Sequence, residues 1–246
     1  MQYKTLIFSL ILILLGCQQV EINSAKQETL EDDSPPLSLN IQANIEQPEY
    51  KSIWEYFVSR SIESNNYILD ERVLYYMNIH LKDISKFTEY LNDSFYFFYF
   101  AIDELEKNDL PIELALVPYI ESNYDPFSIS PSGAVGMWQF MPRTGRFYDL
   151  DRTWWNEDRH DPFASTIAAV KYLEYLYKRF DKDIYLTLAA YNAGPSLLDR
   201  KMRQNKRKGN PTDFRSLDLP EQTKDYIPKY IALKELILNS CLLYTS

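Results

Sequence analysis

The stretch of residues 121–139 constrains the fold most, because it gathers helix-breaking residues between two apolar segments. It holds Pro126, Pro131, Gly133 and Gly136, although the whole chain of 246 residues has only 6 glycines. Regular structure must stop there, and the chain must turn back sharply. So few glycines elsewhere argue against a sandwich or barrel, while the abundant aromatic residues suit packed helices. We therefore predict a mainly α fold around one central loop.

The segment before this loop predicts a helix that carries Glu121. Residues 109–113 provide a capping-type residue, a proline near the first turn and an early acid, so a helix should begin there. Apolar residues then crowd most of its circumference, which indicates a buried helix with Glu121 at its inner end. Burial should raise the pKa of that carboxyl toward neutral, as a general acid requires. The alternative is a buried acid satisfied by loop amides, with Trp138 and Phe140 as plain core.

Three motifs then follow one another along the chain. Glu121-Ser122 precedes Ser-Pro-x-Gly-Ala-x-Gly-x-x-Gln-Phe-Met-Pro over residues 130–142, and Ala-Tyr-Asn-Ala-Gly follows at residues 190–194. In this order, and over about residues 67–236, the chain resembles the lytic transglycosylases of the soluble-transglycosylase family. The resemblance implies a lysozyme-like helical catalytic domain with a helical N-terminal extension. It also implies cleavage of the β-1,4 bond between N-acetylmuramic acid and N-acetylglucosamine, with formation of a 1,6-anhydromuramyl end and without a cofactor.

The resemblance assigns one carboxylate, Glu121, the roles of acid and then base. Asp125 lies in the Pro126 turn and Asp161 precedes a helix, so we expect turn and capping roles for these two acids. The other implied site residues are Ser130 and Gln139, which bind the sugar or its N-acetyl group; Met141, which shapes the subsite; Tyr191, which orients Glu121; and Asn192 and Tyr226, which complete the cleft.

Two other functions share parts of this pattern. A hydrolytic lysozyme of the goose type has the same architecture but delivers water, and an inactive lipoprotein could bind glycan strands without cutting them. The chain is acidic, with 35 Asp and Glu against 26 Lys and Arg, so nucleic acid is a poor partner. His80 and His160 lie far apart without further ligands at metal-binding spacing, so we expect no metal. We expect a monomer whose partners are peptidoglycan glycan strands and a membrane.

The N-terminal residues predict export and anchoring. Residues 1–16 combine one lysine, an apolar run and a small residue before Cys17, the pattern of a lipoprotein signal peptide. We expect a lipid on Cys17 that holds the chain in the cell envelope, at the outer membrane facing the periplasm in a Gram-negative bacterium. An ordinary signal peptide or an anchor helix is the alternative. The polar residues 17–48 predict a disordered tether. With Cys17 lipidated, Cys241 has no partner for a disulfide.

The remaining chain divides into three parts. We expect a helical N-terminal extension over residues 49–108 and the lysozyme-like transglycosylase domain over residues 109–240. Residues 241–246 have no helix cap and no counterpart in the family, which suggests a truncated reading frame. Within the domain, helical spacing predicts a long amphipathic helix over residues 167–180, and an interruption at residues 181–183 precedes the next helix.

Three further segments stand out. Residues 95–100 are six consecutive aromatics, which we expect in the buried middle of a helix rather than on a sugar-stacking surface. Residues 154–162 resemble a bracing element beside the active site of the family, in which aromatic residues such as Trp154 and Trp155 and an Asp-Pro helix entry set the path of the loop. Residues 200–208 carry six basic side chains, and we expect a solvated helix end rather than a patch that steers anionic strands. Lys224 stands where the family usually has an arginine, so a bidentate contact there is not expected.

Overall fold

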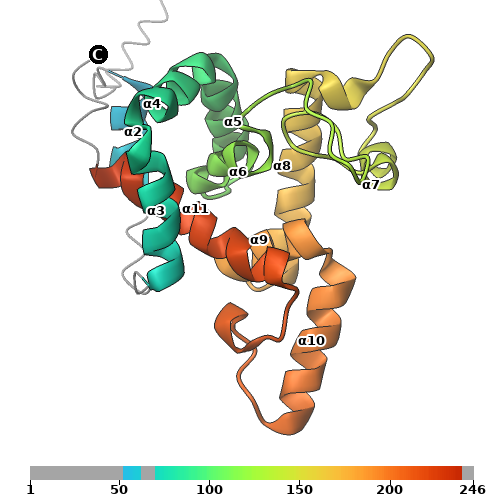
Figure 1. The fold of residues 1–246 in the computed structure, drawn as a ribbon. Coiled ribbons are helices and arrows are strands. Elements are labelled where there is room, and N and C mark those ends of the chain that lie inside the picture. Colours follow the sequence, from blue (N-terminus) through green and yellow to red (C-terminus); the bar gives the residue numbers. More distant parts are fainter. Residues whose placement is uncertain (1–51, 62–69, 240–246) are drawn as a thin grey trace, which may run out of the picture. The chain divides into compact units, whose positions relative to one another are not determined.

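The computed structural model describes residues 52–61 and 70–239, and this part of the chain is mainly helical, as predicted (Figure 1). Within these ranges, extended segments pair only through isolated bridges. None of the helices in the described ranges combines the length and the apolar content that crossing a membrane requires. The expected signal peptide, the lipidation site Cys17, the tether and Cys241 all lie outside the described residues.

Among the described residues before position 109 there are four helices, and polar caps begin most of them. Ser52, Asp70 and Asp83 each accept a hydrogen bond from backbone N–H groups in the first turn of the helix that follows. These caps satisfy donors that the helix itself leaves unpaired. The helices are α2 (Ile53–Arg60), α3 (Glu71–Lys82), α4 (Ile84–Asp93) and α5 (Phe95–Lys107).

The aromatic block does form a helix, α5, but the prediction that it is buried was only partly right. Phe98 is fully buried, whereas Tyr96 is 78% and Tyr99 57% exposed. Successive residues of an α-helix turn by about 100°, so six in a row cover every face and cannot all point into one core. The outward side of α5 is consequently aromatic.

The predicted helix before Glu121 is broken into two pieces. A 3₁₀ helix, η1 (Ile112–Leu116), is followed directly by the short helix α6 (Val117–Ser122). Pro118 explains the break, because proline has no N–H to donate to the carbonyl of Leu114 and is tolerated in the first turn of a new helix. The burial of this segment is as predicted, since every residue from Ile112 to Tyr119 is buried.

The second half of the chain contains the predicted long helix, its interruption and the next helix. Asp161 caps the long helix α8 by accepting the N–H groups of Phe163 and Ala164, as expected. The chain reverses at Asp181 and Lys182, which both have left-handed backbone angles. The elements are α7 (Pro142–Phe147), η2 (Asp158–His160), α8 (Pro162–Arg179), α9 (Ile184–Ala193), α10 (Pro195–Lys208), η3 (Phe214–Ser216) and α11 (Glu221–Asn239).

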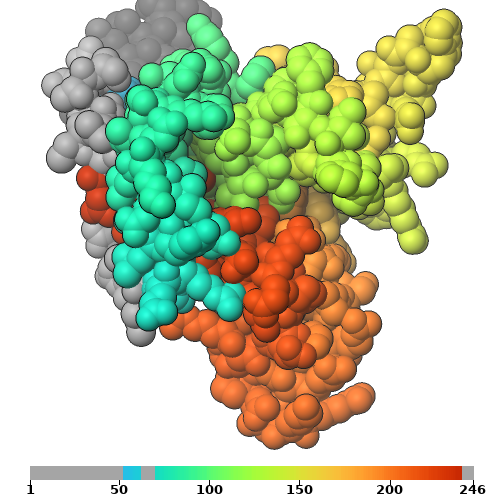
Figure 2. Space-filling model, in the orientation of Figure 1, coloured from blue at the N-terminus to red at the C-terminus, as the bar shows by residue number. Residues whose placement is uncertain are grey.

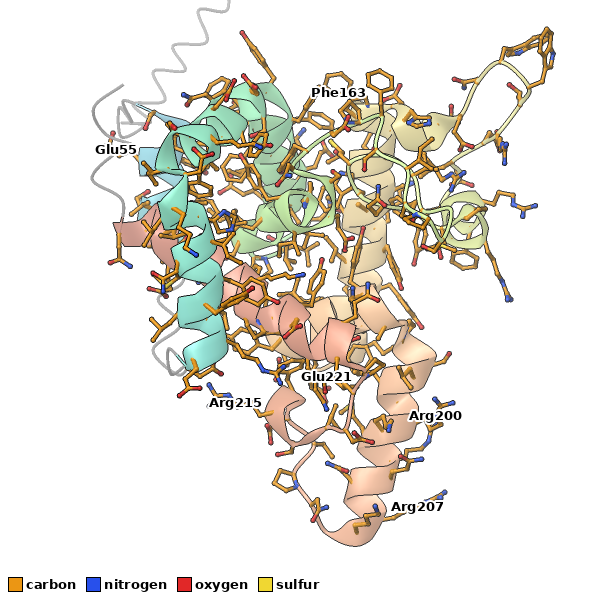
Figure 3. All side chains as sticks on the ribbon, in the orientation of Figure 1. Glu55, Phe163, Arg200, Arg207, Arg215 and Glu221 are labelled. Atoms are coloured by element: carbon orange, nitrogen blue, oxygen red, sulfur yellow. The ribbon has the colours of Figure 1, made fainter. Side chains whose placement is uncertain are left out.

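Helix α11 joins the two halves of the fold, because it packs against α3 on one side and α9 on the other (Figure 1). It also contacts η1 and α6, and the buried ammonium of Lys234 lies 3.2 Å from a carboxylate oxygen of Glu113 in η1. Breaking such a buried ion pair is costly, so it fixes the start of the Glu121 segment against α11. By contrast, Arg200 and Arg207 point outward from α10 (Figure 3), which agrees with a solvated helix end.

Candidate active site

Glu121 is the penultimate residue of α6, where the chain leaves the core. Asn123 and Tyr124 both have positive φ angles, 53° and 63°, so the backbone turns sharply just after the acid. Tyr124 is buried and donates a hydrogen bond of 2.7 Å to the carbonyl of Ala115, which holds this turn against η1. The turn leaves the Glu121 side chain half-buried at the edge of the core.

Burial is the main influence on the Glu121 carboxyl, and it raises the pKa to about 7. Two groups on α11 oppose this effect. The hydroxyl of Tyr226 donates a hydrogen bond of 2.8 Å to Oε1, and the positive charge of Lys229 favours the carboxylate. The predicted direction of the shift is confirmed. Near neutral pH the group is close to half protonated, so it can both release and accept a proton.

The loop of residues 128–140 returns toward Glu121 and is fixed by hydrogen bonds to two helices. Val135 and Phe140 exchange backbone hydrogen bonds of 3.1 and 3.0 Å. The Ser122 hydroxyl of α6 donates to the carbonyl of Met137 at 2.9 Å. The Tyr191 hydroxyl of α9 donates to the carbonyl of Trp138 at 2.8 Å. The loop segment at Met137 and Trp138 is therefore held by hydrogen bonds from α6 and from α9.

Arg159 also fixes this loop through hydrogen bonds, a role that was not predicted from the sequence. The buried guanidinium donates to the carbonyls of Phe140 at 2.8 Å and Gly133 at 3.2 Å, and makes two hydrogen bonds to Glu157. Gly136 packs so closely on the Arg159 backbone that an added Cβ would lie 1.8 Å from its carbonyl oxygen. Arg159 lies among charged and polar residues in the sequence, so it resembles a surface residue. Its role becomes apparent only from the position of η2 beside the loop.

The structure places two of the predicted sugar-binding residues within the loop's own hydrogen-bond network. Gln139 has a φ of 51°, and its side-chain amide donates to the carbonyl of Gly136 at 2.8 Å. The Ser130 hydroxyl accepts the N–H of Ala134 at 2.9 Å. Both residues therefore help to fix the shape of the loop. Met141 is 43% exposed at the start of α7, which leaves its side chain accessible.

The hydrogen bond to the acid that we expected of Tyr191 is made by Tyr226. Tyr191 was expected to orient Glu121, but its single hydroxyl proton goes to the Trp138 carbonyl. Tyr226 of α11 makes the contact with the acid instead. Asn192 accepts a hydrogen bond of 2.9 Å from Thr223, which ties α9 to α11 beside the site. The two helices are thus joined where they present their tyrosines.

The expected bracing role of the tryptophans was wrong. Trp154 and Trp155 are 84% and 74% exposed, with their ring centroids 4.0 Å apart at the tip of a projecting loop. The bracing that the sequence attributed to this segment comes from Arg159 and from the Asp161 cap. The size of aromatic residues suggests that they are buried, but whether they are buried depends on the path of the backbone.

Comparison with known proteins finds a family match over part of the chain and several similar proteins. Residues 98–214 match the family described as transglycosylase SLT domain. Membrane-bound lytic murein transglycosylase D of Escherichia coli (strain K12) is 42% identical over 144 residues, which cover 58% of this chain and 32% of that protein. A putative tributyltin chloride resistance protein of Alteromonas sp. (strain M-1) is 40% identical over 118 residues, 48% of this chain and 57% of that protein.

The chain thus spans about a third of the length of the first of these relatives. Among solved structures, the 70 kDa soluble lytic transglycosylase of Escherichia coli aligns with a TM-score of 0.47 and 22% identity. That alignment covers 56% of this chain and 23% of the other, and a similarity at this level carries no inference about the site.

Proposed function

We propose, from the match of residues 98–214 to the transglycosylase SLT domain family, that the chain is a peptidoglycan lytic transglycosylase. It cleaves the β-1,4 bond between N-acetylmuramic acid and N-acetylglucosamine and leaves a 1,6-anhydromuramyl end. The observation that carries the proposal is a single half-buried carboxyl, Glu121, whose pKa is raised to about 7 beside a loop fixed on three sides.

Glu121 acts first as the acid and then as the base. The protonated carboxyl gives its proton to the glycosidic oxygen, and the bond between that oxygen and C1 of the muramyl residue breaks. The resulting carboxylate takes the proton of the muramyl C6 hydroxyl, whose oxygen attacks C1 and closes the anhydro ring. Because the nucleophile belongs to the substrate, proximity replaces an activated water, and one carboxyl is enough. Its pKa near neutral suits both proton transfers.

A second protein carboxylate is not needed for this chemistry, and the nearest acid in sequence has another task. Most glycosidases use two carboxyl groups, one as the acid and one as the nucleophile or base. Asp125 accepts the N–H of Phe127 at 2.9 Å and so stabilises the turn after α6. Its exposed position supports a structural role rather than a catalytic one. The arrangement therefore favours the substrate's own hydroxyl as the nucleophile.

The other site residues serve the substrate and the acid. Tyr226 positions the Glu121 carboxyl through its hydrogen bond of 2.8 Å. The side-chain amide of Gln139 donates to loop carbonyls, which leaves its carbonyl oxygen for the sugar or its N-acetyl group. Ser130 and Met141 contribute to the same subsite from the two ends of the loop, and Asn192 holds α9 in register with α11.

The same proposal places the protein in the cell envelope. The relatives named membrane-bound lytic murein transglycosylase D and F support attachment to a membrane. We infer the anchor from the sequence pattern, in which residues 1–16 are removed and Cys17 carries the lipid. Palmitate labelling tests it, because incorporation that survives Cys17→Ala contradicts the anchor.

The reaction is tested by digesting purified peptidoglycan and reading the products by mass spectrometry. Wild type should release anhydromuramyl fragments, each lighter by one water than the hydrolytic product, and Glu121→Gln should release none. Asp125→Asn is the matched control, and it should keep the wild-type products because that carboxylate only supports a turn. Hydrated reducing ends would identify a goose-type lysozyme instead, and intact glycan bound by an inactive wild type would identify a binding lipoprotein.

The pH dependence provides a second test. Since Glu121 must begin protonated, the rate should fall as the pH rises through about 7. The Tyr226 hydrogen bond favours the carboxylate, so Tyr226→Phe should raise the pKa of Glu121 and move this decline to higher pH. Tyr191→Phe should leave the decline where it is, because the Tyr191 hydroxyl bonds to a backbone carbonyl. Equal shifts from both variants would contradict the assignment of Tyr226.

A further inference from the structure

A cavity of about 490 Å³ lies beside α6, on the side of the molecule where α3 and α11 meet (Figure 2). Ile120 and Asn123 line it, so residues just before and just after Glu121 form part of its wall. Lys229 of α11 lines it too, and the charge of this lysine acts on the Glu121 carboxyl. The cavity is therefore an immediate neighbour of the candidate acid. Its volume is typical of a small-molecule or peptide pocket.

One part of the cavity wall is apolar and comes mainly from the N-terminal helices. Ile79 of α3 and Phe87 of α4 line it together with Leu233 of α11. His80 packs against Phe87 with ring centroids 4.9 Å apart, and burial lowers its pKa, so it is neutral at pH 7. This wall can accept methyl groups and alkyl chains, but it brings no charge of its own.

Positive charge at the rim comes from two exposed lysines. The Lys86 ammonium lies 5.6 Å from the ring centroid of Tyr90, and the Lys229 ammonium lies 5.3 Å from that of Tyr76. Asp83 also lines the cavity, but its carboxylate accepts the N–H of the first turn of α4 and acts as a helix cap. The two lysines still outnumber this one carboxylate among the lining residues, so the cavity favours a ligand that combines carboxylates with apolar groups.

We propose that this cavity binds the stem peptide carried by the muramyl residue at the scissile bond, which makes the peptide a determinant of substrate choice. The proposal rests on the proposed function, because only a peptidoglycan substrate brings such a peptide next to Glu121. Stem peptides are short and acidic, and they carry methyl and longer alkyl side chains that match the apolar wall. Helices α3 and α4 lie before residues 98–214, so this specificity is supplied from outside the matched domain.

The test compares two substrates, peptide-bearing glycan strands and strands from which an amidase has removed the stem peptides. Wild type should cleave the peptide-bearing strands with the lower KM. Lys86→Glu should raise that KM about threefold to tenfold, as expected for reversing one exposed charge, and should leave kcat and the cleavage of stripped strands unchanged. Lys82→Glu is the matched control, because Lys82 is an exposed lysine at the end of α3 that does not line this cavity.

Each result supports or contradicts the proposal. Equal KM values of wild type on the two substrates would overturn it while leaving the proposed function intact. The same effect from Lys82→Glu and Lys86→Glu would also overturn it, since that result reports the overall charge rather than the cavity. If wild type cleaves neither substrate, the proposed function fails and the peptide site fails with it. A loss confined to Lys86→Glu and to peptide-bearing strands supports the site.

Discussion

The loop of residues 128–140 and the loop of residues 151–157 lie close in sequence but are held very differently. The first receives hydrogen bonds from α6, α9 and Arg159. In the second, Thr153 and Asn156 bond to each other, and Trp154 and Trp155 project outward. Both loops are rich in large apolar residues. What distinguishes them is whether polar side chains from other elements reach their carbonyl groups, which residue type alone does not reveal.

The largest effect should come from Gly136→Ala, because the new Cβ would meet the Arg159 carbonyl oxygen at 1.8 Å. We expect a loss above about 4 kcal/mol in the free energy of unfolding, the range of severe backbone clashes. Gly133→Ala is the control, since Gly133 has a similar φ of 86° but nothing within 4 Å, and it should cost about 1 kcal/mol. Chemical denaturation measures both, and equal losses would show that only the backbone angle matters.

Next, Arg159→Met should cost about 3 kcal/mol, because it removes the donors to two loop carbonyls and leaves Glu157 without its bidentate partner. Arg159→Lys should recover little of this, since an ammonium cannot bridge the carbonyls and the carboxylate together. Thermal unfolding with an activity assay distinguishes the cases. A fully active and stable Arg159→Lys would mean that charge alone holds the loop.

Beside the loop of residues 128–140, helix α6 carries an acid, Glu121, whose ionisation opposes folding. With a pKa of about 7 in the folded protein and 4.5 as its ordinary value, Glu121 binds more protons in the folded state, so stability falls as pH rises between these values. Glu121→Gln lacks this fall, and above pH 8 it should be more stable than wild type by about 2 kcal/mol. Unfolding curves at pH 4 and pH 8 measure the difference. A variant that is less stable at pH 8 would contradict the raised pKa.

Tyr191→Phe should have a smaller effect, about 1 kcal/mol, because it leaves the carbonyl of the buried Trp138 without its hydrogen bond. The ring itself still packs against Tyr172, with centroids 5.4 Å apart, so no cavity forms. Denaturant titration measures the loss. If Tyr191→Phe cost nothing, the α9 contact would be dispensable and the loop would depend on Arg159 and Ser122.

The smallest effect should come from the second loop. Replacing Trp154 and Trp155 together by alanine should change the free energy of unfolding by less than about 0.5 kcal/mol, because both side chains are exposed. The same denaturant titration applies. A loss of several kcal/mol would show that the aromatic pair braces the fold, as the sequence first suggested, and would remove the contrast between the loops.

The parts of the fold that the sequence predicts well depend on local patterns. Spacing and capping chemistry predict the helical extension over residues 49–108, the long helix over residues 167–180 and the helix after it. They also predict the Asp161 cap and the turn role of Asp125. The break before Glu121 was not predicted, although Pro118 cannot continue a helix, because the apolar pattern runs unbroken through it. The raised pKa of Glu121 followed from burial alone. Each of these features needs only neighbouring residues.

The parts that escaped prediction depend on contacts between distant segments. Which tyrosine reaches Glu121 is set by the packing of α9 against α11, and Tyr191 and Tyr226 look alike in sequence. Arg159 meets carbonyls 19 and 26 positions away, and nothing in its immediate sequence points to them. Long-range hydrogen bonds to backbone groups leave no periodic signal, so a single sequence cannot reveal them.

Helix α11 sets a practical limit on how this protein can be divided. It lies after residue 214, where the match to the family ends, yet it supplies Tyr226 to the acid, Lys229 to the neighbouring cavity and Lys234 to the buried pair with Glu113. A fragment that ends at residue 214 would lose Tyr226, which donates the hydrogen bond to Glu121. It would also leave the buried carboxylate of Glu113 without Lys234. A fragment that is meant to fold and act by itself should therefore include α11, through Asn239. A transfer of this domain into another protein must include the same helix.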